Sequence, residues 1–198
     1  MKIPISIPNI ITTLRIGLIP LMVLLFYLPF KGHYLATAIV FTVASVTDWL
    51  DGYLARKLKQ TTPFGAFLDP MADKLIVAVA LILLVEVHAS AWLAVPALVI
   101  VGREIVVSAL REWMAEMGRK ASVAVSYIGK VKTAVQMIAV IFLLANEPDM
   151  DKPLVLLGFV LLYAAAILTI WSMFVYLRIA WPLLSSGLTS DSDRTNLP

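Results

Sequence analysis

The 198-residue chain has no cysteine and few charged residues. Without cysteine it can form neither disulfide bonds nor thiolate metal sites. Asp, Glu, Lys and Arg make up 15% of the residues, whereas hydrophobic residues make up 61%, and the mean hydropathy is +0.91. The hydrophobic residues occur in long blocks, a pattern that favours a polytopic membrane protein over a soluble helical domain.

The start of the chain also lacks two common targeting signals. The first nine residues are not followed by the small-residue cleavage site of a secretory signal, and no long Arg- and Ser-rich presequence is present. We therefore expect no cleavable leader, and the missing presequence favours a bacterial origin. No internal repeat is evident, so the sequence offers no support for an inverted-repeat transporter.

Six apolar runs approach or exceed the roughly 20 residues that a helix needs to cross the bilayer core. They predict an all-α integral membrane protein with six transmembrane helices, at residues 14–30, 34–54, 68–88, 91–111, 123–145 and 153–178. Residues 3–12 mix isoleucine with Pro8, Asn9 and Thr12 and predict a short amphipathic helix at the membrane interface. We expect one membrane domain over residues 1–184 and a flexible polar tail over 185–198.

The distribution of basic residues predicts the orientation of these spans. If both termini are cytoplasmic, 14 of the 16 Lys and Arg residues lie on the cytoplasmic side, and only Lys31 and Lys152 lie outside. Cytoplasmic loops of membrane proteins are enriched in Lys and Arg. The sequence therefore predicts cytoplasmic termini and a multi-pass protein of the bacterial cytoplasmic (inner) membrane.

Four aspartates flank the predicted connection between the second and third spans. Asp48 and Asp51 are three residues apart and Asp69 and Asp73 are four apart, so each pair lies on one face of its helix. A carboxylate at the centre of a membrane helix costs roughly 2.5–3.5 kcal/mol on insertion scales. Divalent metal ions would compensate, because they prefer hard oxygen ligands. Two ions about 3.5–4 Å apart could be held here, facing the cytoplasm, with positions open for a phosphate-bearing substrate.

A structural alternative is that the aspartates form a solvated cluster paired with Arg56, Lys74 and other basic groups. That alternative places no demand on Gly52 and Gly65 beside the carboxylates. A metal–phosphate site does require small residues at these positions, because a bulky diphosphate must approach the backbone closely. Oxygen-only ligands favour Mg²⁺ or Mn²⁺ over zinc.

The acidic residues belong to a longer pattern, D-x₂-D-G-x₂-A-R-x₈-G-x₃-D-x₃-D. It is filled at every position, by Asp48, Asp51, Gly52, Ala55, Arg56, Gly65, Asp69 and Asp73. This pattern resembles the signature of the CDP-alcohol phosphotransferase family, whose N-terminal segment the residues from Pro8 to Arg15 also resemble. Residues 103–115 and 126–133 are similar to bacterial members that join CDP-diacylglycerol to glycerol 3-phosphate.

The resemblance implies the family's six-span fold, two divalent cations, Mg²⁺ or Mn²⁺, and a homodimer. It implies that Asp48, Asp51 and Asp69 hold one ion and that Asp48, Asp69 and Asp73 hold the other. Asp73 would also be the general base that accepts the proton of the attacking hydroxyl. The residues implied to bind CDP-diacylglycerol are Asn9, Thr12, Gly52, Ala55, Arg56 and Gly65, although Arg56 has an alternative as a topology determinant, and Asn9 and Thr12 as helix caps.

The acceptor implied by the resemblance, glycerol 3-phosphate, is a dianion, so fixed cations near the metal ions would select it. Arg111 and Lys130 are the leading candidates for its phosphate, with Arg103, Arg119 and Lys132 as further candidates. Each of these residues could instead determine topology near anionic lipid headgroups.

Two other functions stay open at this point. A sister enzyme of the same family could use inositol phosphate, serine or phosphatidylglycerol as acceptor, because the fold does not define the substrate. A divalent-cation transporter would need acidic residues near the bilayer midplane or along a pore. The sequence disfavours that function, since the four aspartates are confined to the predicted cytoplasmic side. We expect no nucleic acid among the binding partners.

Overall fold

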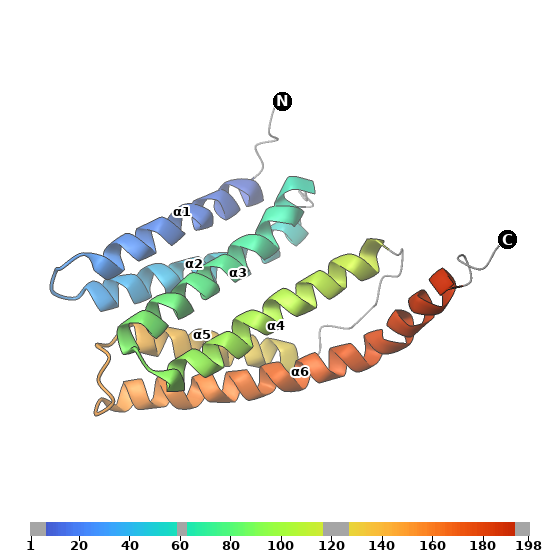
Figure 1. Ribbon diagram of the computed structural model, residues 1–198. Helices are drawn as coiled ribbons and strands as arrows, with labels where there is room; N and C mark the ends of the chain where they lie inside the picture. The colour runs from blue at the N-terminus through green and yellow to red at the C-terminus, as the bar shows by residue number, and fades with distance from the viewer. Residues whose placement is uncertain (1–6, 59–62, 117–126, 193–198) are drawn as a thin grey trace.

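The computed structural model describes residues 7–58, 63–116 and 127–192, and within these ranges the chain is helical without strands. The helices are α1 (Ile7–Tyr27), α2 (His33–Leu58), α3 (Pro63–His88), α4 (Ala91–Glu116), α5 (Tyr127–Leu144) and α6 (Pro153–Ser192). They run alternately up and down, with the α1–α2, α3–α4 and α5–α6 connections at one end of the bundle (Figure 1). The ends of α2, α4 and α6 and the starts of α1, α3 and α5 lie at the other end.

Local sequence explains several helix boundaries. Proline is the first residue of α3 and of α6, a position where its missing N–H costs no helical hydrogen bond. Ser90 caps α4, because its Oγ accepts a hydrogen bond from the Trp92 amide at 3.3 Å. Between α1 and α2 the chain turns at Gly32, whose φ of +94° lies in the left-handed region that glycine enters without steric cost.

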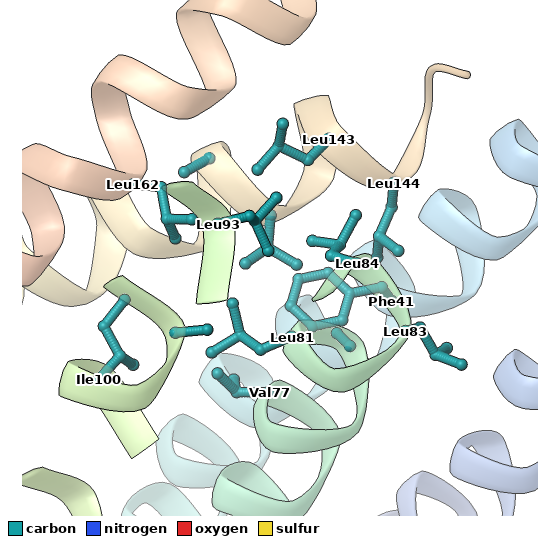
Figure 2. Packing of buried hydrophobic residues seen from close by; sticks show 14 of the residues in the cluster. Phe41, Val77, Leu81, Leu83, Leu84, Leu93, Ile100, Leu143, Leu144 and Leu162 are labelled. Atoms are coloured by element: carbon teal, nitrogen blue, oxygen red, sulfur yellow. The ribbon is translucent and has the colours of Figure 1, made fainter. Parts of the chain in front are cut away.

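Helix α3 lies at the centre of the packing, in contact with α1, α2, α4 and α5. Its residues Val77, Leu81 and Leu84 belong to a buried hydrophobic cluster to which the other helices contribute (Figure 2). Helix α6 packs on α4 and α5. The aspartates of α3 are therefore carried by the helix that has the most helical neighbours.

Large hydrophobic side chains also cover the outside of the bundle. Examples are Leu14, Ile39, Ile82, Leu98 and Ile167, which are between 54% and 72% exposed. Exposed apolar surface of this extent indicates contact with lipid or another protein. By length and composition, α4 and residues Pro153–Arg178 of α6 could each cross a membrane, and shorter apolar helical stretches occur at Ile11–Tyr27, His33–Thr47 and Val131–Leu144.

The structure corrects the prediction for the N-terminal segment. We expected a separate interfacial helix at residues 3–12, but α1 begins at Ile7 and continues without a break to Tyr27. Pro8 does not interrupt the helix, because it lies in the first turn, where no N–H is needed for a helical bond. Residues 1–6 lie outside the described residues.

The end of α6 also differs from the predicted boundary. Helix α6 continues to Ser192, so residues 185–192, the first part of the predicted flexible tail, are helical. Extending an existing helix is easier than nucleating a new one, which allows α6 to continue into polar sequence. The described part of α5 begins at Tyr127, and residues 123–126 of the predicted fifth span lie outside the described residues.

Candidate active site

The four aspartates lie on two helices that pack against each other. Asp48 and Asp51 are in the second half of α2, and Asp69 and Asp73 are in the first half of α3. These segments adjoin the short α2–α3 connection, at the end of the bundle where α1 begins (Figure 1). The helix placement agrees with the predicted antiparallel arrangement.

Only one of the four carboxylates, that of Asp73, is among the described side chains, and it is 35% exposed. The side chains of Asp48, Asp51 and Asp69 lie outside that set. Among the side chains that are described, no three His, Asp or Glu residues form a group able to hold a metal ion. The donor set itself fits hard cations, because it consists of carboxylates on adjacent helices in a chain without thiolates.

Arg15 is an observed partner of Asp73 and was missed by the sequence reasoning. Its Nη1 donates a hydrogen bond to Oδ1 of Asp73, which forms an ion pair between α1 and α3. The Arg15 side chain is only 1% exposed. Sequence reasoning counted Arg15 among the cytoplasmic positive charges. The sequence did contain a signal that Arg15 belongs to the site, because it follows the candidate binding residue Thr12 by one helical turn. In the structure Thr12 is also buried.

The residues implied to bind CDP-diacylglycerol are only partly described. Thr12 of α1 and Gly65 of α3 are buried, and both helices contact each other. Gly52 and Ala55 lie within α2. The side chains of Asn9, Ala55 and Arg56 lie outside the described residues.

A polar network connects α3 to the helices that carry the candidate acceptor-binding cations. The Lys74 ammonium, next to Asp73 in the sequence, donates to the Ser108 hydroxyl of α4. Ser108 in turn donates to the backbone carbonyl of Glu104, one helical turn earlier. The network thus begins beside the proposed base and enters α4.

Glu104 extends the network to α5. Its Oε1 accepts hydrogen bonds from Nη1 of Arg103 and from Nζ of Lys132, each at 2.9 Å. Arg103 also donates from Nη2 to the Ser172 hydroxyl of α6 at 3.3 Å. Sequence reasoning noted Glu104 only as a neighbour of Arg103, because a contact between residues 104 and 132 leaves no trace in local spacing.

The five candidate phosphate-binding cations occupy different environments. Arg103 and Lys132 are in the network just described, and Lys132 is buried. Arg111 is exposed, with its guanidinium carbon 5.5 Å from the centroid of the Tyr176 ring of α6, a cation–π distance. Lys130 lies in α5 but its side chain is outside the described residues, as is Arg119.

At the opposite end of the bundle, a hollow of about 400 Å³ lies between the α1–α2 and α5–α6 connections. Lys31, His33, Glu147 and Lys152 line it. The Lys152 ammonium donates to Glu147 at 2.8 Å, which lowers the pKa of Glu147 and raises the pKa of Lys152. The side chains of Glu147 and Lys152 are 69% and 38% exposed, so water screens the pair and it has little weight in the stability of the fold.

Known proteins are similar to this chain over most of its length. Residues 5–171 match the sequence profile described as CDP-alcohol phosphatidyltransferase. A protein of Pseudomonas fluorescens named CDP-diacylglycerol–glycerol-3-phosphate 3-phosphatidyltransferase is 59% identical over 182 residues, which cover 91% of this chain and 93% of the relative.

Two further relatives with the same name are somewhat less similar. The protein of Yersinia pestis (strain Pestoides F) is 54% identical over 176 residues, or 89% of this chain and 95% of the relative. That of Sodalis glossinidius (strain morsitans) is 54% identical over 175 residues, or 88% of this chain and 94% of the relative.

Proposed function

The chain belongs to the CDP-alcohol phosphatidyltransferase family, and on that premise we propose that it transfers the phosphatidyl group of CDP-diacylglycerol to sn-glycerol 3-phosphate. The products are phosphatidylglycerophosphate, a precursor of phosphatidylglycerol and cardiolipin, and CMP. The observation that carries the proposal is the 54–59% identity, over about nine-tenths of the chain, to relatives named for this reaction. The intact eight-position acidic pattern supports the chemistry that the family shares, and the identity to these relatives supports the acceptor.

We also propose that the enzyme lies in the bacterial cytoplasmic membrane, with six spans, cytoplasmic termini and an active site that faces the cytoplasm. The exposed apolar side chains on the outside of the bundle support a lipid environment. The excess of Lys and Arg at the end that carries the aspartates supports the orientation. By resemblance to the family, two copies of the chain form a homodimer.

In this proposal Asp48, Asp51, Asp69 and Asp73 hold two divalent cations, Mg²⁺ or Mn²⁺. When bound, such ions neutralise negative charge on the phosphoryl oxygens as it develops. Asn9, Thr12, Gly52, Ala55, Arg56 and Gly65 bind CDP-diacylglycerol. The small residues of this set leave room for the diphosphate beside the helix backbone.

Asp73 accepts the proton of the 1-hydroxyl of glycerol 3-phosphate. The hydroxyl oxygen forms a bond to the phosphorus that carries diacylglycerol, and the bond from that phosphorus to the bridging oxygen of CMP breaks. CMP leaves with the bridging oxygen. Arg15 supports this role, because its buried guanidinium is hydrogen-bonded to Oδ1 of Asp73 and restricts the carboxylate's orientation.

Cations of α4, of α5 and of the segment between them recognise the phosphate of the acceptor. Arg111 and Lys130 are the leading candidates, with Arg103, Arg119 and Lys132 as further ones. A phosphate monoester carries a charge of about −1.5 to −2 at neutral pH, so several cations are needed to select it over an uncharged alcohol.

The test is an acceptor comparison with the purified protein in detergent, CDP-diacylglycerol, and Mg²⁺ or Mn²⁺, in which CMP release is measured. We expect release with glycerol 3-phosphate and background levels with inositol phosphate, serine and phosphatidylglycerol. Chelation with EDTA should stop release, and added Mg²⁺ or Mn²⁺ should restore it. Faster release with one of the other acceptors would assign the chain to a sister activity.

A further inference from the structure

Glu104 holds two cations from different helices on a single carboxylate oxygen. Arg103 of α4 and Lys132 of α5 both donate to Oε1 of Glu104 at 2.9 Å. The side chains of Lys132 and Arg103 are 4% and 15% exposed, whereas that of Glu104 is 29% exposed. One acidic residue at the edge of the buried region is therefore a shared hydrogen-bond partner of two largely buried cations.

The same residue is connected to the helix that carries the proposed base. Lys74 of α3 donates to Ser108, and Ser108 donates to the backbone carbonyl of Glu104. Arg103 reaches Ser172 of α6. Four helices thus meet in one network, and its α3 member adjoins Asp73 in the sequence.

The network carries more positive than negative charge. Lys74, Arg103 and Lys132 supply three cations and Glu104 supplies one anion, which leaves a formal excess of +2. Excess charge in a partly buried region is unfavourable unless an anion compensates it. A phosphate monoester, with a charge near −2, would balance the excess.

Two buried polar atoms of α4 and α5 have no observed hydrogen-bond partner. They are Nε of Arg103 and Oε1 of Gln136, and Gln136 lies one helical turn after Lys132 on α5. Buried polar groups are usually hydrogen-bonded, and an unsatisfied group costs roughly 1–3 kcal/mol. The unmet donor on Arg103 is the second observation that points to an anionic ligand here, because a phosphate oxygen can accept its hydrogen bond.

We propose that Glu104 is a positioning residue for the acceptor: it holds Arg103 and Lys132 in place so that the phosphate monoester meets two preorganised cations. The inference rests on the proposed function and deepens it. Without Glu104 the two cations repel each other, and Lys132 must be ordered again each time the acceptor binds. Ordering a long side chain on binding costs affinity, and fixing it beforehand avoids that loss.

The first experiment compares Glu104→Gln with the wild type. We expect the KM for glycerol 3-phosphate to rise roughly tenfold, while the KM for CDP-diacylglycerol changes less than about twofold, because only the acceptor uses these cations. The matched control is Glu112→Gln, an exposed glutamate two turns further along α4, which should leave both KM values unchanged. An unchanged acceptor KM in Glu104→Gln, or an equal rise for both substrates, would overturn the proposal.

A double-mutant cycle tests whether Glu104 acts through its partner. Lys132→Met alone should raise the acceptor KM, and adding Glu104→Gln should then have less effect than it has in the wild type, because coupled residues are not additive. Fully additive effects would show that Glu104 acts independently of Lys132 and would contradict the inference.

Glu104→Asp covers the case in which Glu104→Gln does not fold. It retains the charge that compensates the buried cations, but its shorter side chain no longer reaches Lys132 in the same position. We expect a thermal unfolding midpoint close to wild type together with a several-fold higher acceptor KM; a folded variant with the wild-type acceptor KM would overturn the proposal. If the wild type itself releases no CMP with glycerol 3-phosphate, the proposed function fails. If the wild type is active but the Glu104 variants keep its acceptor KM, only the positioning role is refuted.

Discussion

At the residue scale, the ion pair between Arg15 and Asp73 links the first helix to the proposed base. Arginine is rarely buried unless it is paired, and here its side chain is 1% exposed. Groups that hydrogen-bond a metal-ligating carboxylate orient it, and their loss commonly costs 10–100-fold in activity or metal affinity. Arg15 is therefore a candidate positioning residue that the positive-inside count alone would treat as a topology determinant.

Replacing Arg15 with Gln should lower kcat by roughly 10–100-fold, because the amide cannot hold Asp73 with a charged hydrogen bond. Arg15→Lys should recover part of the loss, since it keeps the charge but lacks the planar donor geometry. CMP release and the Mg²⁺ concentration for half-maximal activity are the measurements. Lys31→Gln, at the opposite end of the bundle, is the control, and wild-type kcat in folded Arg15→Gln would refute the role.

The proposed metal ligands can be tested by an isosteric change. Asp69→Asn should reduce CMP release to background, because the neutral amide is a poor ligand for a divalent cation. The variant should still insert into membranes and elute as a single species in detergent. Asp151→Asn, an exposed aspartate in the α5–α6 connection, should retain full activity. Substantial turnover by Asp69→Asn would contradict the metal role.

At the scale of helices, the contact between α5 and α6 depends on Gly158. A Cβ atom at this position would lie 2.8 Å from Cγ and 3.0 Å from Cδ2 of Leu143, and 3.4 Å from the Ala139 carbonyl oxygen. Leu143 is itself buried at 1% exposure, so it has little room to move away. Small residues that allow close approach are typical of helix interfaces in membranes.

Gly158→Ala should therefore lower the thermal unfolding midpoint in detergent, since overpacking costs roughly 1–3 kcal/mol. The matched control is Gly17→Ala in α1, where nothing lies within 4 Å of the added Cβ. This control should be neutral or slightly stabilising, because alanine is the better helix former. Equal midpoints for the two variants would show that α5 and α6 can separate without cost.

At the scale of the whole molecule, the absence of cysteine makes the proposed orientation directly testable. In spheroplasts, a membrane-impermeant maleimide should label Met150→Cys, an exposed position in the α5–α6 connection. Glu116→Cys, at the other end of the bundle, should be labelled only after permeabilisation. The unlabelled wild type is the control. The reverse pattern would place the aspartates outside the cell.

Much of the architecture could be predicted from the sequence because hydrophobic length is a local property. Six apolar runs predicted six helices, and six helices are present among the described residues. The match to the CDP-alcohol phosphatidyltransferase profile confirms the family indicated by the acidic pattern. Helix ends were less predictable: α1 begins earlier than its apolar run and α6 ends later, because helices continue through polar residues that hydropathy excludes.

The sequence by itself determined the family and the helical composition, because these depend on residue types at short spacings. Only the tertiary structure decided that Arg15 pairs with Asp73, 58 residues away, and that Glu104 binds Lys132, 28 residues away. Such contacts depend on how helices rotate and pack against each other. That packing decides which residues a charged side chain meets across a helix interface. The spacing of residues along one helix carries no information about it.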